Sequence, residues 1–373
     1  MINKCGGCGA IIQFNDPEKI GYINQDVYNK RILENKEILC ERCFRLKHYN
    51  EIKKLTIDED KFIELVQNNI TNNMLICYIV DLFDLDGSLV KDIRDLFPHN
   101  EILVIGNKYD LFSRSNRPTK LKKYLNNYLE DNNIETIGSI ITSATDEYSA
   151  KKVYESILKI INTKKLSHEV FFFGMSNAGK TTFLKSMGEL FDNEEAKSLI
   201  TSKAISTTLG LKEIDLGELK IIDSPGLVNN SVFTYYLNKK TIDYIMPKSM
   251  LKPRIFQLNS YQSIFIEGFA KISLLDTVTK TSAIVNVANN IKLHRTKYQD
   301  SDLFYEKHLN DLFVMPNKQE RSKLGDLKKV KYNIGLDEEI SICGLGFISF
   351  NQEVEVEVTT FEKIKVVIRK KII

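Results

Sequence analysis

The sequence lacks several features that would place the protein in a membrane or outside the cell. None of its apolar runs approaches the roughly 18 residues that a membrane-spanning helix needs. The chain starts MINKCGGCGA, without the basic and then apolar stretch of a secretory signal. It also lacks an internal repeat and a strong charge excess, since the net charge is +3. These absences predict a cytoplasmic protein without a membrane partner, whose cysteines serve as thiols or metal ligands rather than in disulfides.

What is present suits a globular protein of two or three domains. Hydrophobic residues make up 43% and charged residues 27% of the 373, which allows a sizeable buried core. Short apolar runs alternate with helical lengths, at 74–81, 101–110, 139–144, 169–174 and 219–226. This order predicts an α/β fold with a parallel sheet and helices on both faces. A helix is expected over about 148–161, where apolar residues recur on one face.

The last part of the chain has a different pattern. Residues 354–370, VEVEVTTFEKIKVVIRK, alternate apolar and polar residues. This alternation predicts half-exposed strands and a separate β-rich domain after about residue 230. The charged residues Arg369, Lys370 and Lys371 are expected to form a solubilising sheet edge.

A phosphate-binding loop follows the apolar run at 169–174. Residues 174–181, GMSNAGKT, fit the pattern G-x-x-x-x-G-K-[ST] between a strand and a helix. The glycines and the helix N-terminus turn backbone N–H groups toward phosphates, while Lys180 reaches the β- and γ-phosphates. An ordinary strand-to-helix turn with a chance lysine is the alternative. The predicted nucleotide-binding residues here are Gly174, Asn177, Ala178, Gly179, Lys180, Thr181 and Thr182.

The motif NKYD at 107–110 indicates which base is bound. A carboxylate at Asp110 accepts from the guanine ring N–H and its exocyclic amine, whereas adenine presents a lone pair at that ring nitrogen. Asn107 can bond the base edge and tie to the phosphate loop, and the stem of Lys108 can cover the ring. The motif TSA at 142–144 adds a backbone N–H for the guanine oxygen, from Ser143 or Ala144. NKYD alone could be a polar loop at a strand end, but its pairing with TSA favours guanine.

Two further motifs complete a GTPase-like set. Asp223, in DSPG at 223–226, is expected to hold the magnesium shell, and the N–H of Gly226 to meet the γ-phosphate. In ISTTLG at 205–210, Thr208 is favoured over Thr207 for closing over magnesium. The predicted magnesium ligands are Thr181, Thr208 and Asp223. The predicted catalytic residues are Asn177, Lys180, Thr208 and Gly226.

These motifs occur in an unusual order along the chain. NKYD and TSA precede the phosphate loop and DSPG, whereas an ordinary GTPase begins with its phosphate loop. The same sheet can form from either order if the old termini are joined and a new break is made, because domain termini often lie close together. Residues 162–168 would be the join, and the new break would follow DSPG. The residues from 227 onward would then hang directly from a nucleotide-sensitive loop.

The permuted order, preceded by a CxxC pair and then CERCFRLKHYNEI at 40–52, resembles the YqeH family of ribosome-assembly GTPases. The resemblance spans nearly the whole chain and includes the motifs at 252–258, 294–297, 305–308 and 344–347. It implies a role in small (30S) ribosomal subunit maturation and a C-terminal β-rich RNA-binding fold. The chain departs from the family at Ile205 and Ser206, where Pro-Gly is expected, and at Phe347, where Trp is expected.

The hydrolysis step cannot use the glutamine of Ras-type enzymes, because Leu227 follows the DSPG glycine. Asn177 resembles the residue that helps related GTPases hold a potassium ion beside the phosphates, where a fixed cation could act like an arginine finger. An ordinary loop residue is the alternative. We expect slow intrinsic hydrolysis of GTP to GDP and phosphate, stimulated by potassium if this hypothesis holds.

The first four cysteines form two CxxC pairs. Four thiolates suit a tetrahedral zinc ion, and residues 9–39 between the pairs make the intervening loop long for a compact ribbon. Disulfides and an iron–sulfur site are the alternatives, whereas Cys77 and Cys343 lie in apolar runs and are expected in the core. The predicted zinc ligands are Cys5, Cys8, Cys40 and Cys43.

Basic residues near two of these motifs could contact RNA. Arg42, Arg45, Lys47 and His48 follow the second cysteine pair, and His294, Arg295, Lys297 and Tyr298 form a basic and aromatic group. Solvated charged loops explain both groups equally well.

The sequence as a whole predicts three domains. These are a zinc-binding domain (1–55), a circularly permuted GTPase domain (56–228) and a β-rich RNA-binding domain (229–373). The predicted function is GTP hydrolysis coupled to assembly of the small ribosomal subunit and its rRNA, with GTP or GDP, Mg²⁺, Zn²⁺ and, by hypothesis, K⁺. The alternatives are a nucleotide-gated RNA or protein scaffold with negligible hydrolysis, and a metabolic enzyme, for which a second catalytic constellation is missing.

Overall fold

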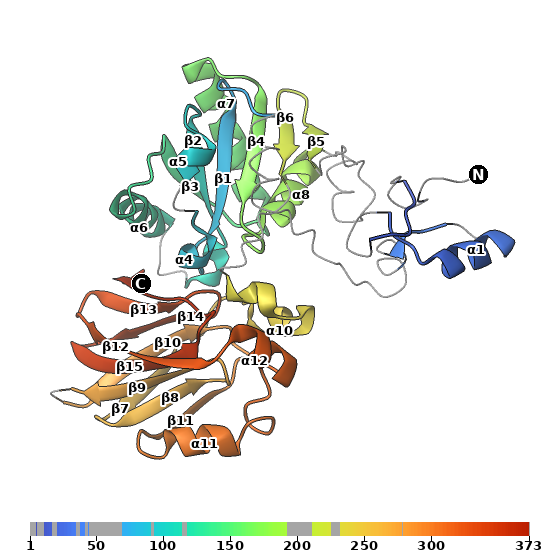
Figure 1. Cartoon of the computed structure of the whole chain (residues 1–373). Coiled ribbons are helices and arrows are strands. Elements are labelled where there is room, and N and C mark those ends of the chain that lie inside the picture. Colours follow the sequence, from blue (N-terminus) through green and yellow to red (C-terminus); the bar gives the residue numbers. More distant parts are fainter. Residues whose placement is uncertain are drawn as a thin grey trace.

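A six-stranded sheet forms the centre of the first half of the computed structural model (Figure 1). The structure describes residues 5, 11–16, 21–34, 38–41, 44, 69–90, 93–113, 118–191, 211–224, 232–277 and 279–372. The sheet has the order β3-β2-β1-β4-β6-β5, and β5 alone of these strands is antiparallel to its neighbour. The strands are β1 (Leu75–Asp81), β2 (Ile102–Asn107), β3 (Gly138–Ile141), β4 (Glu169–Gly174), β5 (Lys212–Asp215) and β6 (Lys220–Asp223). The five apolar runs identified in the sequence are therefore confirmed as strands of one mostly parallel sheet.

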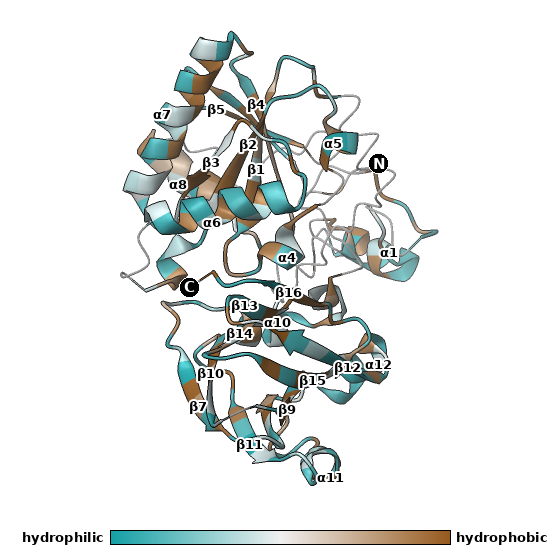
Figure 2. Ribbon diagram, turned by 90° about the vertical axis from the view of Figure 1, so that its left-hand side faces the viewer, coloured by the Kyte–Doolittle hydropathy of each residue, from teal (hydrophilic) through white to brown (hydrophobic). Residues whose placement is uncertain are grey.

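Helices cover both faces of this sheet, so that its central strands are buried on both sides. In Figure 2 the strands are brown where α6 and α7 pack, and the outer faces of these helices are largely teal. The helix α6 buries Leu121, Leu125 and Leu129, which are spaced one turn apart. The helical elements here are α4 (Leu85–Ser88), α5 (Ile93–Leu96), η1 (Tyr109–Leu111), α6 (Pro118–Asp131), α7 (Glu147–Lys164) and α8 (Lys180–Leu190).

The helix α7 is longer than predicted and shortens the join before β4. It begins after Asp146, whose side chain accepts from the Tyr148 N–H, and it ends at Lys165, which adopts a left-handed conformation. Residues 162–164 of the predicted join are therefore helical. Residues 165–168 lead directly into β4, so the connection from α7 to β4 is short.

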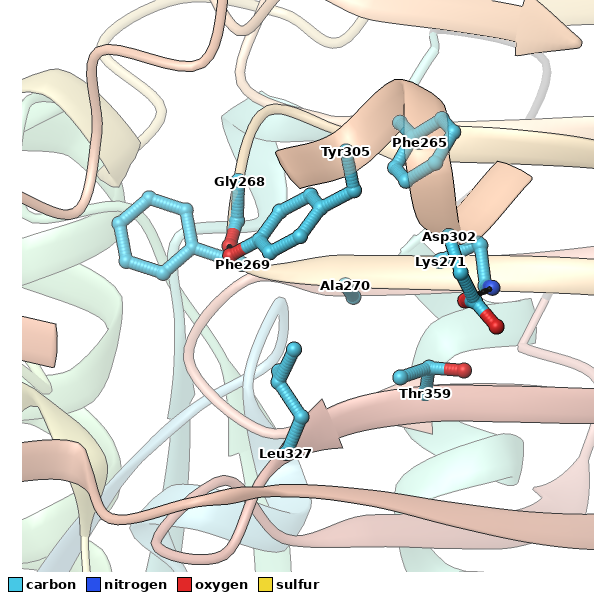
Figure 3. Close-up of a pocket in the computed structure, with 9 residues that line it drawn as sticks. All are labelled: Phe265, Gly268, Phe269, Ala270, Lys271, Asp302, Tyr305, Leu327 and Thr359. Atoms are coloured by element: carbon cyan, nitrogen blue, oxygen red, sulfur yellow. Dashed lines mark hydrogen bonds and ion pairs between the residues drawn. The ribbon is translucent and has the colours of Figure 1, made fainter. Parts of the chain in front are cut away.

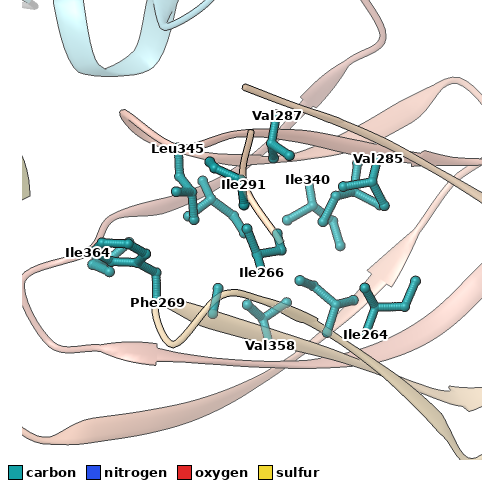
Figure 4. Packing of buried hydrophobic residues seen from close by; sticks show 14 of the residues in the cluster. Ile264, Ile266, Phe269, Val285, Val287, Ile291, Ile340, Leu345, Val358 and Ile364 are labelled. Carbon is teal, nitrogen blue, oxygen red and sulfur yellow. The ribbon is translucent and has the colours of Figure 1, made fainter. Parts of the chain in front are cut away.

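Two five-stranded antiparallel sheets form the second half, residues 232–372, which we call the β region. Their inward side chains make one core, part of which is seen in Figure 4. The orders are β16-β13-β14-β10-β7 and β11-β8-β9-β15-β12. The strands are β7 (Arg254–Leu258), β8 (Gln262–Ile266), β9 (Ala270–Asp276), β10 (Thr281–Val287), β11 (Leu293–Lys297), β12 (Leu327–Ile334), β13 (Glu338–Ile342), β14 (Gly346–Phe350), β15 (Val354–Phe361) and β16 (Val366–Lys370). The helices are η2 (Phe233–Tyr236), α10 (Lys239–Ile245), α11 (Ser301–Lys307) and α12 (Lys318–Leu324).

The β region packs against the end of the six-stranded sheet where α4 lies (Figure 1). Arg369 of β16 pairs with Asp86 of α4 at 2.7 Å and with Glu339 of β13 at 2.9 Å. The prediction that Arg369 lies on a solubilising edge is thus wrong, because its side chain is only 3% exposed. The segment does form strands, as predicted, but β15 is not half-exposed, since all of its residues except Glu355 are buried. The face of β16 that carries Arg369 is covered by α4. The neighbouring Lys370 does lie at the surface.

The N-terminal part is described in short segments that include α1 (Gln25–Leu33). The predicted domain boundaries at 55/56 and 228/229 lie outside the described residues and remain predictions. Within the described part of the chain, no helix has the length and hydropathy needed to span a membrane.

Candidate nucleotide-binding site

The candidate site lies at the edge of the six-stranded sheet where its parallel strands end. Asp81 ends β1, Asn107 ends β2, Gly174 ends β4 and Asp223 ends β6. Loops at this edge of an open α/β sheet can converge on one ligand even when they are far apart in the sequence. The permuted order of the motifs therefore leaves them side by side in space.

The phosphate loop after β4 has the backbone that its glycines permit. Gly179 has φ +89°, and a Cβ at this position would lie 2.3 Å from Nδ2 of Asn107. A Cβ on Gly174 would lie 2.7 Å from the carbonyl oxygen of Ile79. Asn177 also has a positive φ of 70° and is exposed. Both glycines are thus required for close packing of the loop against neighbouring backbone and side chains.

Lys180 begins α8 and points toward the end of β6. Its ammonium group contacts a carboxylate oxygen of Asp223 and the carbonyl oxygen of Ser224, and both side chains of the ion pair are buried. The structure thus brings together the lysine that the sequence assigns to phosphates and the aspartate that it assigns to magnesium. The charges are of the kinds that would hold a nucleotide phosphate and Mg²⁺.

Asn107 ties three loops together. Its Nδ2 donates to the carbonyl of Ala178 in the phosphate loop at 2.9 Å. Its Oδ1 accepts from the backbone N–H of Ala144 at 2.9 Å. The contact with the phosphate loop agrees with the sequence-based expectation. The N–H of Ala144, one of the two that the sequence offers to the guanine oxygen, is therefore bonded to Asn107 in this structure.

Asp110, whose carboxylate is expected to bind guanine, is exposed and has a hydrogen bond to one of its oxygens. Oδ1 of Asp110 accepts from the Ser143 hydroxyl at 2.7 Å. The residues from 107 to 112, which we call the guanine loop, turn sharply at Lys108, whose φ is +69°. Asp110 and Ser143 are therefore neighbours, as the pairing of NKYD with TSA predicted.

Asp81 is a site residue that the sequence did not identify. Its Oδ2 lies 2.5 Å from Nζ of Lys108, and its side chain is 4% exposed. Its other oxygen accepts from the N–H of Phe83 at 2.9 Å. This pair fixes the end of the lysine whose stem is expected to cover the base. The apolar run ending in Asp was visible in the sequence, but its partner depends on pairing of β1 with β2.

The remaining predicted residues have different outcomes. Thr181 and Thr182 are exposed in the first turn of α8. Thr208 and Gly226 lie outside the described residues. Their predicted roles at magnesium and the γ-phosphate therefore stay predictions.

The structure brings two of the predicted zinc ligands together. Cys5 and Cys40 are both buried, and the N–H of Cys40 lies 3.2 Å from Sγ of Cys5. An N–H directed at sulfur would support a metal-bound thiolate, and the zinc site stays a prediction. Cys8 and Cys43 lie outside the described residues, and the described residues alone contain no metal-binding cluster. Cys77 and Cys343 are buried thiols, which confirms that they belong to the core.

A pocket in the β region is unsuited to a nucleotide. It is lined by residues of β8, β9, β15 and α11, among them Lys271, Asp302 and Tyr305 (Figure 3). Its cavity volume is about 20 Å³, which is room for one or two water molecules. Asp302 also pairs with Lys271 at 2.5 Å. The pocket is therefore a small feature of the β region, separate from the strand ends that carry the motifs.

The sheet, the phosphate loop and the guanine loop define a P-loop GTPase fold, whose guanine-side strands come first along the chain. A family model described as 50S ribosome-binding GTPase matches residues 169–309, beginning at β4. A model described as YqeH-like, C-terminal, matches residues 280–372. A Bacillus subtilis protein, titled uncharacterized protein YqeH, is 31% identical over 92% of each chain. The chain therefore belongs to the YqeH family, as its motifs suggested.

Two more distant relatives come from plants. A putative nitric oxide synthase of Oryza sativa is 22% identical over 92% of this chain and 69% of its own length. The NO-associated protein 1, chloroplastic/mitochondrial, of Arabidopsis thaliana is 23% identical over 93% of this chain and 69% of its own length. The crystal structure of YjeQ from Thermotoga maritima covers 47% of this chain and 57% of that chain at 13% identity, with a TM-score of 0.27, which supports no inference.

Proposed function

We propose that the protein binds guanine nucleotides and hydrolyses GTP as a switch in assembly of the small ribosomal subunit. The observation that carries the nucleotide part is the link made by Asn107. Its side chain joins the phosphate loop to the TSA loop, so that a phosphate site and a base site share one frame. The ribosomal part rests on family resemblance, and we place this activity in the cytoplasm.

Each side of the nucleotide has its own residues in this proposal. Asp110 accepts from the guanine N–H groups while Ser143 orients it. Lys180 exchanges its contact with Asp223 for the β- and γ-phosphates, which releases the aspartate toward the magnesium shell. Magnesium, held by Thr181, Thr208 and Asp223, would neutralise charge on the phosphates during transfer.

Hydrolysis is proposed to be slow without a partner, since Leu227 cannot orient a water. Asn177 is placed in the phosphate loop, exposed and with a left-handed backbone, where its side-chain oxygen could help hold a potassium ion. Gly226 would offer its N–H to the γ-phosphate. These assignments predict faster turnover in potassium than in sodium, and a loss of that difference in Asn177→Ala.

The β region is proposed to bind rRNA, in part through β11. Arg295 and Lys297 are exposed there. His294 is stacked on Phe304, with ring centroids 4.5 Å apart, and Tyr298 faces Glu357, so these two rings serve packing as well. The basic residues Arg42, Arg45, Lys47 and His48 lie outside the described residues. We propose that Cys5, Cys8, Cys40 and Cys43 hold zinc and thereby order that segment.

A second candidate is a nucleotide-gated scaffold that binds GTP or GDP without appreciable hydrolysis. Leu227, in place of a water-orienting glutamine, is the observation that favours it. The two candidates share the same nucleotide site and differ only in turnover.

GTP turnover in potassium chloride tests the proposal, with purified small subunits, large subunits or neither. The large subunit is included because the matching family model is described by the 50S particle. Stimulation by small subunits alone is the expected result, and Lys180→Ala should abolish it. Stimulation by large subunits alone would overturn the small-subunit role. Tight GTP binding with no turnover under any condition would favour the scaffold.

A further inference from the structure

The β region touches the guanine loop through one aromatic side chain. Phe347 lies in β14 and is 1% exposed. Its ring stacks on that of Phe112, with 6.5 Å between centroids and 19° between planes. It also packs against Phe83, with centroids 6.2 Å apart. Both partner rings belong to the strand-end loops of the six-stranded sheet.

These partner rings adjoin the residues that are proposed to meet the base. Phe112 ends the guanine loop, two positions after Asp110. Phe83 follows Asp81, and its N–H donates to that carboxylate, which in turn fixes Lys108. Phe347 therefore supports both the carboxylate side and the lysine side of the proposed guanine pocket.

A second contact from the β region reaches the same turn. The N–H of Leu251, just before β7, donates to the carbonyl of Leu111 at 2.8 Å. Leu251 is buried in the same apolar cluster as Phe112 and Phe347. The guanine loop is thus held by the β region through its backbone as well as through an aromatic ring.

Phe347 is itself held rigidly. It lies between β10 and β13 in a five-stranded sheet. A Cβ on the preceding Gly346 would lie 2.2 Å from the carbonyl oxygen of Asn286, so the strands approach closely there. The guanidinium of Arg369 lies 5.5 Å from the ring centroid. A side chain fixed in this way can orient the groups that rest on it.

We propose that Phe347 is a positioning residue for guanine recognition, acting from the β region on Asp110 and Lys108. The proposal rests on the proposed guanine site. It implies that a partner which shifts β14 changes nucleotide affinity at the base, and that nucleotide binding acts back on the β region by the same free energy.

Phe347→Leu in the full chain tests this role through the ratio of affinities for GDP and inosine diphosphate. Inosine lacks the exocyclic amine from which Asp110 would accept, so the ratio reports how well that carboxylate is placed. We expect Phe347→Leu to lower the ratio about fivefold, within the usual range of coupling between sites. Phe347→Trp keeps a ring in the same position and should retain most of the ratio.

The matched control is Phe265→Leu. Phe265 is equally buried in the β region, but it packs on Phe313 and Tyr305, away from the guanine loop. Phe265→Leu should keep the wild-type affinity ratio while losing about as much stability as Phe347→Leu. If Phe347→Leu does not fold, Phe112→Leu probes the same stack from the other side.

Asp110→Asn separates failure of the proposal from failure of the guanine site. We expect it to abolish the preference for GDP over inosine diphosphate. If it keeps that preference, the proposed guanine site is wrong, and the role of Phe347 falls with it. If Asp110→Asn loses the preference while folded Phe347→Leu keeps it, the positioning role alone is overturned.

Discussion

Asp84 lies between the six-stranded sheet and the β region, and its carboxyl group is in an unusual environment. Burial, followed by the charge of Asp81, raises the pKa of Asp84 to about 7, although a backbone N–H of Gly344 acts in the opposite direction. The same carboxylate caps α4 by accepting from the N–H of Gly87 at 3.2 Å. Asp84 is therefore expected to exchange a proton near neutral pH.

The sign of its effect on stability follows from the raised pKa. A carboxyl group that binds its proton more tightly when folded stabilises the fold fully below its unfolded pKa, near 4. That contribution is lost as pH rises through about 7. Asp84→Asn mimics the protonated form and can still cap α4. Between pH 5 and pH 8 its stability relative to wild type should therefore rise, by about 1–2 kcal/mol after allowance for solvent screening.

Urea unfolding followed by circular dichroism at several pH values would measure this difference. The exposed Asp131→Asn serves as a control, since its partner Lys370 is also exposed and little pH-dependent change is expected. Parallel stability curves for wild type and Asp84→Asn would contradict the prediction.

The phosphate loop illustrates how a short element depends on its backbone. Alanine at Gly179 would force a side chain into a left-handed conformation and place its Cβ 2.3 Å from Nδ2 of Asn107. The Asn107 link between the phosphate and guanine loops would have to break. We expect Gly179→Ala to weaken GDP binding more than tenfold, a loss above about 1.4 kcal/mol.

Gly217→Ala provides the control for backbone strain alone. Gly217 has φ +81°, but nothing lies within 4 Å of a Cβ built there. Gly217→Ala should lower the free energy of unfolding by about 1–2 kcal/mol and leave GDP affinity unchanged. Fluorescent GDP titration and urea unfolding measure the two effects, and equal GDP affinity in both variants would refute the role assigned to Gly179.

Local patterns predicted the elements of the site but not their mutual contacts. The strand runs, the phosphate loop and NKYD were each recognisable because hydrophobic periodicity and turn chemistry act over a few residues. The short strand β5 was missed, since KEID has no apolar run and is a strand only through pairing with β6. The bond between Asp81 and Lys108 likewise depends on the pairing of β1 with β2, which no local pattern shows.

Contacts between residues that are far apart in the chain are harder still to predict from the sequence. Arg369 and Asp86 are separated by 283 residues, and the alternation around Arg369 is equally compatible with an exposed edge. Their pairing depends on how the β region docks on α4, which no local window contains. The chain order predicts only that the residues from 227 onward follow directly on the DSPG loop.

Arg369→Met tests how strongly this buried ion pair network stabilises the whole molecule. The side chains of Arg369, Asp86 and Glu339 are each at most 3% exposed. Asp86 also accepts from the Tyr128 hydroxyl at 2.5 Å. Removing the arginine leaves two buried carboxylates without their cation, which is expected to cost about 3–5 kcal/mol. Lys370→Ala removes an exposed pair with Asp131 and should cost less than about 1 kcal/mol.

A triple variant separates lost charge pairing from lost packing. Arg369→Met combined with Asp86→Asn and Glu339→Gln removes the unpaired charges while keeping similar volumes, so most of the stability should return. The chain has no tryptophan, so thermal and urea unfolding are followed by circular dichroism. If Arg369→Met costs no more than Lys370→Ala, the network contributes little. If the triple variant stays as unstable as Arg369→Met, the loss comes from packing between the β region and α4 rather than from buried charge.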